Sequence, residues 1–211
     1  MNQTSHLKAL VEFNFLPICY LHESWFDEIP HGEFIKKVRS HKNAHTPLSD
    51  HLLESYSIKG AFFFDVESFP GSIALMTSDE LERLIYLAGV CLNFEALRNC
   101  ISGKVVSNIK KSIGTEAYLF SIKRAPYLMQ NMPEFEISSS SYSSLDEKIL
   151  MCGMACLATA VIDSSKALWQ RLLFKLPYQL VGAFDEKKLI KEKSDVMRLL
   201  QQLHTEIAFL S

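Results

Sequence analysis

The sequence predicts a mainly α fold: a single compact multi-helix globular domain with an irregular, aromatic-rich N-terminal region. Of the 211 residues, 48% are hydrophobic, which is enough apolar material to fill a sizeable core. Glycine and proline number only 8 and 7, and so few turn residues favour long helices over a many-stranded sandwich. A chain of this length usually forms one domain, so we expect residues 1–211 to form a single one.

The N-terminal part, residues 1–76, is expected to be largely irregular. Its early aromatic residues are interrupted by Pro17 and Pro30, and they are Phe13, Phe15, Tyr20, Trp25 and Phe26. Short helices are predicted over residues 33–39 and 48–56, with a polar loop between them. Residues 60–66 are predicted to form a strand or a packed loop. This segment holds three consecutive phenylalanines that must point in different directions, so some of them should anchor it to the body.

The central part, residues 77–125, is predicted to be helical. Thr77 and Glu80 have the spacing of a capping box, and the helix they begin is expected to continue to Ile101 before Gly103. Because residues 84–92 carry no charge and are apolar all round, this helix should be buried. The side chains expected in the core are Leu84, Ala88, Cys91 and Leu92. Further helices are predicted over residues 104–112 and 115–123.

Gly89 lies in the middle of the predicted buried helix. A glycine in a helix interior costs about 1 kcal/mol relative to alanine. A close crossing with another helix would explain why a glycine stands at this position.

The sequence between residues 126 and 144 is rich in proline and serine and is predicted to be a surface loop. C-terminal helices are expected over residues 145–211. The first follows a capping box of Ser144 and Glu147 and runs to residue 162, and a second covers residues 166–176.

The last helix is predicted to begin near Asp185 and to be amphipathic. Its apolar stripe, expected to pack on the body of the protein, consists of Leu189, Val196, Leu200, Leu203, Ile207 and Leu210.

Charge and hydropathy exclude several classes of function. The formal net charge is −2, which argues against a general nucleic-acid binder and against a polybasic lipid-binding surface. The longest uncharged stretch, residues 149–162, is shorter than the ~20 apolar residues of a membrane span, so no direct membrane insertion is expected. The five cysteines are scattered and odd in number, which indicates free thiols in a reducing, cytoplasmic compartment.

No catalytic or cofactor-binding motif is present in the sequence, so we expect no enzyme activity and no cofactor. His41, His45 and His51 lack the paired spacing and cysteine partners of a zinc site, and we interpret them as solvated loop residues. Cys152 and Cys156 share an apolar helix face and are expected to be core thiols.

Trp169 and Arg171 offer a conceivable nucleic-acid contact. Leucines surround them on the predicted helix, so we instead expect a tryptophan at the edge of the core and a solvated arginine.

The beginning of the last helix is locally basic, although the chain as a whole is slightly acidic. Complementary charge steers encounters and gives specificity, so this face is a candidate site for an acidic protein partner. Its residues are Lys187, Lys188, Lys191 and Arg198. The alternative is that they form an ordinary solvated helix face.

Three stretches together resemble the adaptor family of the bacterial type III secretion sorting platform, the SctK-type proteins YscK, PscK, OrgA and MxiK. They are residues 16–22 (LPICYLH), residues 81–101 with LAGVCL and EALRNCI, and residues 168–177 with LWQRL and KLP. These stretches have the order and approximate places that they have in the family, and they cover about a quarter of the chain.

The resemblance implies a non-enzymatic cytoplasmic adaptor. Such a protein links the cytoplasmic domain of the inner-membrane ring protein to the pod protein beneath it, and so associates with the inner membrane only through the secretion apparatus. Two alternatives remain open at this point. A helical enzyme would show a polar pocket assembled from scattered residues, and a type III secretion chaperone would co-purify with one effector.

Overall fold

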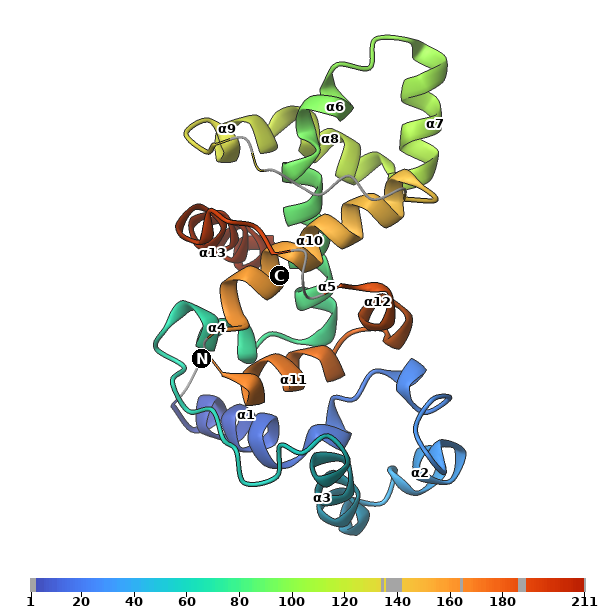
Figure 1. Cartoon of the computed structure of the whole chain (residues 1–211), viewed down its shortest axis with the longest axis vertical. Coiled ribbons are helices and arrows are strands. Elements are labelled where there is room, and N and C mark those ends of the chain that lie inside the picture. The colour runs from blue at the N-terminus through green and yellow to red at the C-terminus, as the bar shows by residue number, and fades with distance from the viewer. Residues whose placement is uncertain (1–2, 134, 136–141, 164, 186–188, 211) are drawn as a thin grey trace. The chain divides into compact units, whose positions relative to one another are not determined.

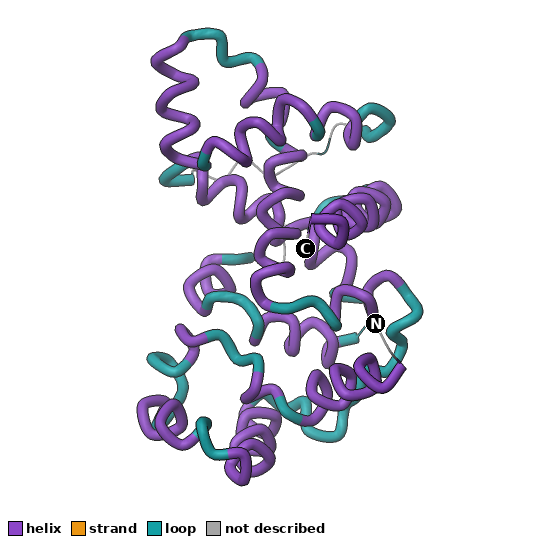
Figure 2. The backbone as a smooth tube through the Cα atoms, turned by 180° about the vertical axis from the view of Figure 1, so that it is seen from behind, coloured by secondary structure: helices purple, strands orange, loops and turns teal. Residues whose placement is uncertain are grey.

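The structure is a computed structural model, and it describes residues 3–133, 135, 142–163, 165–185 and 189–210. Throughout these residues the regular structure is helical and no strand occurs, as Figure 2 shows. The predicted mainly α fold is therefore confirmed. The chain divides into two compact units: unit 1 comprises Met1–Leu81 and Val161–Ala183, and unit 2 comprises Glu82–Ala160 and Phe184–Ser211.

Unit 1 combines N-terminal helices with two helices from the last third of the chain (Figure 1). Its α-helices are α1 (Gln3–Phe15), α2 (Gly32–Val38), α3 (His45–Ser55), α4 (Phe69–Ala74), α11 (Lys166–Phe174) and α12 (Tyr178–Ala183). Short 3-10 helices join them: η1 (Pro17–Cys19), η2 (Glu23–Trp25) and η3 (Lys42–Ala44).

Unit 2 contains α6 (Phe94–Arg98), α7 (Gly103–Ile113), α8 (Thr115–Lys123), α9 (Ala125–Met129) and α13 (Lys193–Leu210). It also holds most of α5 (Ser78–Leu92) and α10 (Leu145–Val161), the two helices in which the division between the units falls. Helix α8 contacts α6, α7 and α9.

The prediction of an irregular N-terminal region is wrong for α1 and α4. Near the end of α1, the buried Asn14 side chain bonds both backbone groups of Phe63, so a tertiary contact holds this helix. Helix α4 has local signals: Ser68 caps it by accepting from the Gly71 N–H at 3.3 Å, and a proline occupies its first turn.

Helices α5 and α10 both begin with capping boxes. The N–H of Thr77 donates to Glu80 Oε2 at 2.8 Å, and the N–H of Glu80 donates to Thr77 Oγ1 at 3.3 Å, as predicted. At α10 the N–H of Glu147 donates to Ser144 Oγ at 3.1 Å. The Glu147 carboxylate, however, accepts from the N–H of Ser143 at 2.8 Å, one residue earlier than predicted.

Helix α5 ends at Leu92 and not at Ile101, where the sequence places its end. Asn93 leaves the helical conformation, with φ −112° and ψ 8°, and its side-chain amide donates to the Gly89 carbonyl at 2.9 Å. This bond satisfies one of the free carbonyls of the last turn. Leu92, the last residue of the helix, is only half-buried. The other predicted core residues are fully buried: Leu84, Ala88 and Cys91.

Helices α5 and α10 cross in unit 2 at two glycines (Figure 1). A Cβ on Gly89 would lie 1.9 Å from the Ile149 carbonyl oxygen, and a Cβ on Gly153 would lie 1.9 Å from the Ile85 carbonyl oxygen. The contact is reciprocal, and each backbone fills the space that a side chain would take. The close crossing predicted at Gly89 is therefore confirmed.

The loop predicted over residues 126–144 begins with a helix, α9, because Pro126 occupies the first turn, where its missing N–H costs nothing. Within that loop, residues 134 and 136–141 lie outside the described residues.

Helix α13 begins at Lys193 and not near Asp185. The preceding segment instead enters the core, where Ile190 is buried and its N–H donates to Thr159 Oγ1 at 2.9 Å. Leu189, predicted to be part of the apolar stripe, is 40% exposed. The stripe is confirmed at Val196, Leu200, Leu203 and Ile207, which are buried together with Leu199. The side chain of Leu210, the last predicted member, lies outside the described residues.

The glycine crossing predicts an unusual response to alanine. Gly89→Ala and Gly153→Ala should each lower the free energy of unfolding by about 3 kcal/mol, because the added methyl meets a backbone carbonyl that cannot rotate away. Gly182→Ala in α12 is the matched control, since its Cβ would meet nothing within 4 Å and alanine should add up to about 1 kcal/mol. Urea unfolding measures all three, and three equal values would contradict the proposed role of the crossing.

Candidate interaction surfaces

Helix α11 supplies two buried cations to unit 1. Arg171 is fully buried, so the solvated position predicted for it is wrong, while Trp169 is buried as well. The Arg171 guanidinium donates to the Asn14 carbonyl at 3.0 Å and to the Ala167 carbonyl at 3.2 Å. It therefore joins the end of α1 to α11, and this contact uses backbone carbonyls instead of a carboxylate.

Lys175, directly after α11, is the second buried cation. Its Nζ donates to the Ala74 carbonyl at 2.8 Å and to the Met76 carbonyl, at the C-terminal end of α4, where helix carbonyls carry partial negative charge. Nζ also lies 5.2 Å from the ring centroid of Phe13 and 5.3 Å from that of Tyr20. Burial lowers the pKa of Lys175 to about 8, because few opposite charges replace the water it loses.

Five large apolar side chains form an exposed surface of unit 1, the α1 apolar patch, and each of them is at least 42% exposed: Leu7, Val11, Phe15, Phe62 and Phe64. The first three stand four residues apart and therefore on one face of α1. The Phe62 ring lies 4.9 Å from Phe15 and 5.8 Å from Phe64, between ring centroids. Contiguous exposed apolar surface of this kind is typical of interaction sites.

The middle phenylalanine of residues 62–64 explains why the other two face solvent. Phe63 is buried, and its backbone N–H and carbonyl are both bonded to the Asn14 side chain at 2.8 Å. In an extended segment neighbouring side chains point to opposite sides, so burial of Phe63 turns Phe62 and Phe64 outward. This confirms the prediction that only some of these phenylalanines anchor the segment.

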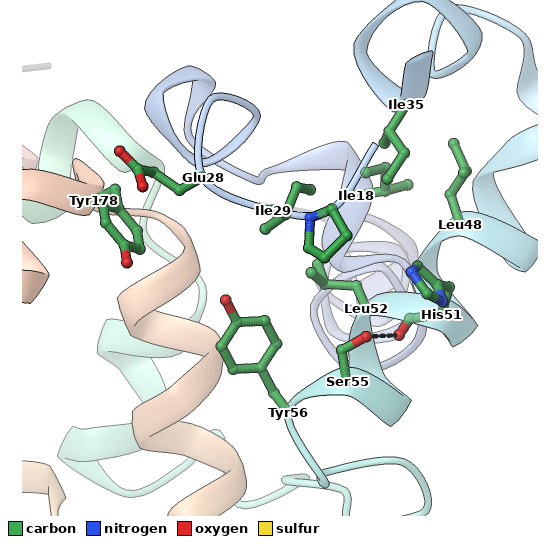
Figure 3. A pocket seen from close by; sticks show the side chains of 11 residues that line it. Ile18, Glu28, Ile29, Ile35, Leu48, His51, Leu52, Ser55, Tyr56 and Tyr178 are labelled. Carbon is green, nitrogen blue, oxygen red and sulfur yellow. Dashed lines mark hydrogen bonds between the residues drawn. The ribbon is translucent and has the colours of Figure 1, made fainter. Parts of the chain in front are cut away.

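Unit 1 also contains a pocket of about 250 Å³ (Figure 3). Its floor consists of the buried side chains of Ile18, Ile35 and Leu52. Half-buried side chains form the walls: Ile29, Leu48, Tyr56 and Tyr178. The exposed residues at its rim are Glu28, Pro30, His51 and Ser55.

Trp25 holds the two tyrosine walls of this pocket. Its ring packs edge-on against Tyr56 at 5.8 Å and Tyr178 at 5.1 Å between centroids, and its Nε1 donates to the Leu176 carbonyl at 2.8 Å. The backbone N–H of Tyr178 donates to Ser24 Oγ at 2.8 Å. Burial raises the pKa of Tyr56, so its hydroxyl stays protonated at neutral pH.

The structure places only part of the predicted basic face. Lys187 and Lys188 lie outside the described residues, and Lys191 is exposed ahead of α13. Arg198 is exposed on α13, but its guanidinium donates to the Asn131 carbonyl at 2.7 Å and to Asp195 at 3.0 Å. Arg198 thus holds the segment after α9 against α13, and this contact had no signal in the sequence.

The cysteines predicted to be core thiols are buried, and burial raises the pKa of both Cys152 and Cys156. The interpretation of the histidines as solvated loop residues is wrong for His45, which begins α3, is only half-exposed and bonds the Arg39 carbonyl at 2.8 Å. His41 and His51 are exposed, although His51 lies within α3. Across the described part of the chain, no three His, Cys, Asp or Glu side chains are placed to hold a metal ion.

The apolar patch and the pocket were not predicted from the sequence. The patch had a usable signal, since Leu7, Val11 and Phe15 follow a helical spacing of four residues. The pocket had none, because its lining comes from separate segments between residues 18 and 178 that only the fold brings together.

Comparison with known proteins identifies the family. The model of the family described as YOP proteins translocation protein K (YscK) matches residues 8–209, so the chain belongs to the YscK family. No curated protein matches the sequence significantly.

One solved structure has the same fold. It is described as the cytoplasmic domain of the T3SS sorting platform protein PscK from P. aeruginosa, and its TM-score with this chain is 0.61 at 20% sequence identity. The match covers 94% of each chain. In the described residues, no helix is long and apolar enough to cross a membrane.

The buried Lys175 predicts a pH-dependent effect of Lys175→Met. Between the lysine's pKa of about 8 in the folded protein and its ordinary value of 10.5, the unfolded chain binds the proton and the folded protein does not. The free energy of unfolding of the wild type, relative to that of the variant, should therefore increase by roughly 2 kcal/mol between pH 7.5 and 9.5.

Urea unfolding of the two proteins at both pH values measures this difference. The buried thiols also titrate in this range on unfolding, but they are present in both proteins and cancel. If the difference in free energy of unfolding between the wild type and Lys175→Met stays constant with pH, the lowered pKa of Lys175 is contradicted.

Proposed function

We propose that this chain is a non-enzymatic cytoplasmic adaptor of the type III secretion sorting platform, linking the cytoplasmic domain of the inner-membrane ring protein to the pod protein. The observation that carries the proposal is membership of the YscK family over residues 8–209. The fold of the PscK cytoplasmic domain, a sorting platform protein, supports the same assignment. The chain would be held at the inner membrane only through the secretion apparatus.

The surfaces of the chain support a role in protein binding. The α1 apolar patch exposes aromatic and aliphatic side chains that a folded protein would otherwise bury. In unit 2, the predicted basic face of Lys187, Lys188, Lys191 and Arg198 would meet an acidic surface of a partner. Two surfaces of different chemistry, in different units, suit a protein that joins two others.

Substitutions in the α1 apolar patch test the role in binding. Phe62→Ser with Phe64→Ser should weaken binding to the ring or the pod protein at least tenfold, about 1.4 kcal/mol, because the patch loses its two outermost rings. Stability should change little, since both side chains are exposed. The control is Tyr127→Ser, which removes a 75% exposed ring outside the patch.

Calorimetric titration with purified ring cytoplasmic domain and purified pod protein provides the affinities. Wild-type protein that binds neither of them would contradict the adaptor function. Unchanged binding by the double variant would instead remove only the patch from the interface.

Charge reversal tests the basic face. Lys188→Glu with Lys191→Glu should weaken binding to one partner severalfold at low salt, and the effect should shrink as salt screens the charges. Arg198 is best changed separately, because Arg198→Glu also breaks its bond to the Asn131 carbonyl. Binding is measured at two salt concentrations. Equal affinities of the double variant and the wild type would show that this face does not bind a partner.

A further inference from the structure

The volume of the unit 1 pocket limits what it can bind. Pockets for cofactors and drug-sized molecules usually measure about 300–1,000 Å³, whereas a cavity of roughly 150 Å³ lined by apolar side chains already holds benzene. At about 250 Å³, the pocket lined by Ile18, Ile35, Leu52 and their neighbours lies between these sizes. It therefore suits one large aliphatic or aromatic side chain.

The pocket is formed before any partner binds. Its floor is part of the buried core, and the Tyr56 and Tyr178 rings are fixed by their edge-on contacts with Trp25. Tyr56 is further held by an edge-on contact with Phe174 at 5.0 Å. A preformed apolar pocket binds a side chain without the entropic cost of ordering its own walls, and the anchor residues of protein interfaces usually occupy such pockets.

The charge at the rim is negative on one side. Glu28 lines the pocket and Asp27 precedes it, and both are exposed. Two cations of this region, Lys36 of α2 and Arg39 at its C-cap, pair with Glu23 instead, at 3.4 and 2.9 Å. Figure 3 shows Glu28 and His51 on opposite sides of the pocket, so a cation of the ligand is favoured on the Glu28 side.

We propose that this pocket is a docking site for a protein partner, that it receives one aliphatic or aromatic side chain of that partner, and that a lysine or arginine beside this anchor pairs with Glu28. The identity of the partner as a sorting-platform protein rests on the proposed function. The proposed chemistry of the pocket is independent of that function, because it rests on the residues that line the pocket.

A small probe tests the chemistry without any partner. Tryptamine carries an apolar ring and an ammonium group, and 3-indolepropionate carries the same ring with a carboxylate. In amide NMR titrations, tryptamine should shift the resonances of pocket residues and bind about threefold more tightly, and Glu28→Gln should remove this preference. Shifts confined to other residues, or equal binding of both probes by the wild type, would overturn the proposal.

A second experiment uses the purified ring cytoplasmic domain and pod protein of the same secretion system. Glu28→Lys, which reverses the rim charge, and Leu48→Phe, which fills the pocket, should each weaken binding of the same partner at least tenfold. Glu33→Lys is the matched control, because Glu33 is exposed in unit 1 and does not line the pocket. Circular dichroism confirms that each variant is folded.

The outcomes separate the two proposals. If the wild type binds a partner and both pocket variants bind it equally well, the docking site is wrong and the adaptor function stands. If the wild type binds neither partner, the adaptor function fails, and the tryptamine titration alone decides whether the pocket has the proposed chemistry.

Discussion

The close crossing of α5 and α10 is the contact on which the rest of unit 2 depends. At Gly89 and Gly153 each helix presses its backbone against a carbonyl of the other, so the two helices approach more closely than side chains would allow. Ile149 and Val90, which flank the crossing, then belong to the same core cluster as residues from α6, α7 and α8. A change in the distance between α5 and α10 would therefore displace the whole cluster, since packed cores leave little free volume.

Unit 1 is held together differently, by buried polar groups bonded to backbone. Asn14 bonds the segment of Phe63, Arg171 bonds the end of α1, and Lys175 bonds the end of α4. Such groups are costly to bury, and a misplaced one loses its partners and leaves an unpaired polar atom in the core. They therefore specify one arrangement of irregular segments that apolar contacts alone would leave less well defined.

The helices were largely predictable because their signals are local. Capping boxes at Thr77 and Ser144 and the uncharged run after residue 84 located α5 and α10. Most of the wrong predictions concern residues whose position depends on tertiary contacts, which the sequence does not show. Ile190 enters the core ahead of α13, where its N–H donates to Thr159, and Arg171 is buried at the end of α1, where it donates to the distant Asn14 carbonyl. The pocket was unpredictable for the same reason. The early end of α5 is different, because the bond from Asn93 to the Gly89 carbonyl spans only four residues and was a local signal that the sequence analysis missed.

The distribution of polar groups connects these two kinds of packing to function. In the described residues the most deeply buried cations, Arg171 and Lys175, donate to backbone carbonyls, and burial raises the pKa of the core thiols and so keeps them protonated. Groups in these environments hold the fold and are poorly placed to attack a substrate. The side chains available for contact with a partner lie at the surface instead, in the α1 apolar patch and at the acidic rim of the pocket. Exposed apolar surface of this kind is typical of interaction sites, and it agrees with the protein partners implied for a member of a family of type III secretion sorting platform components.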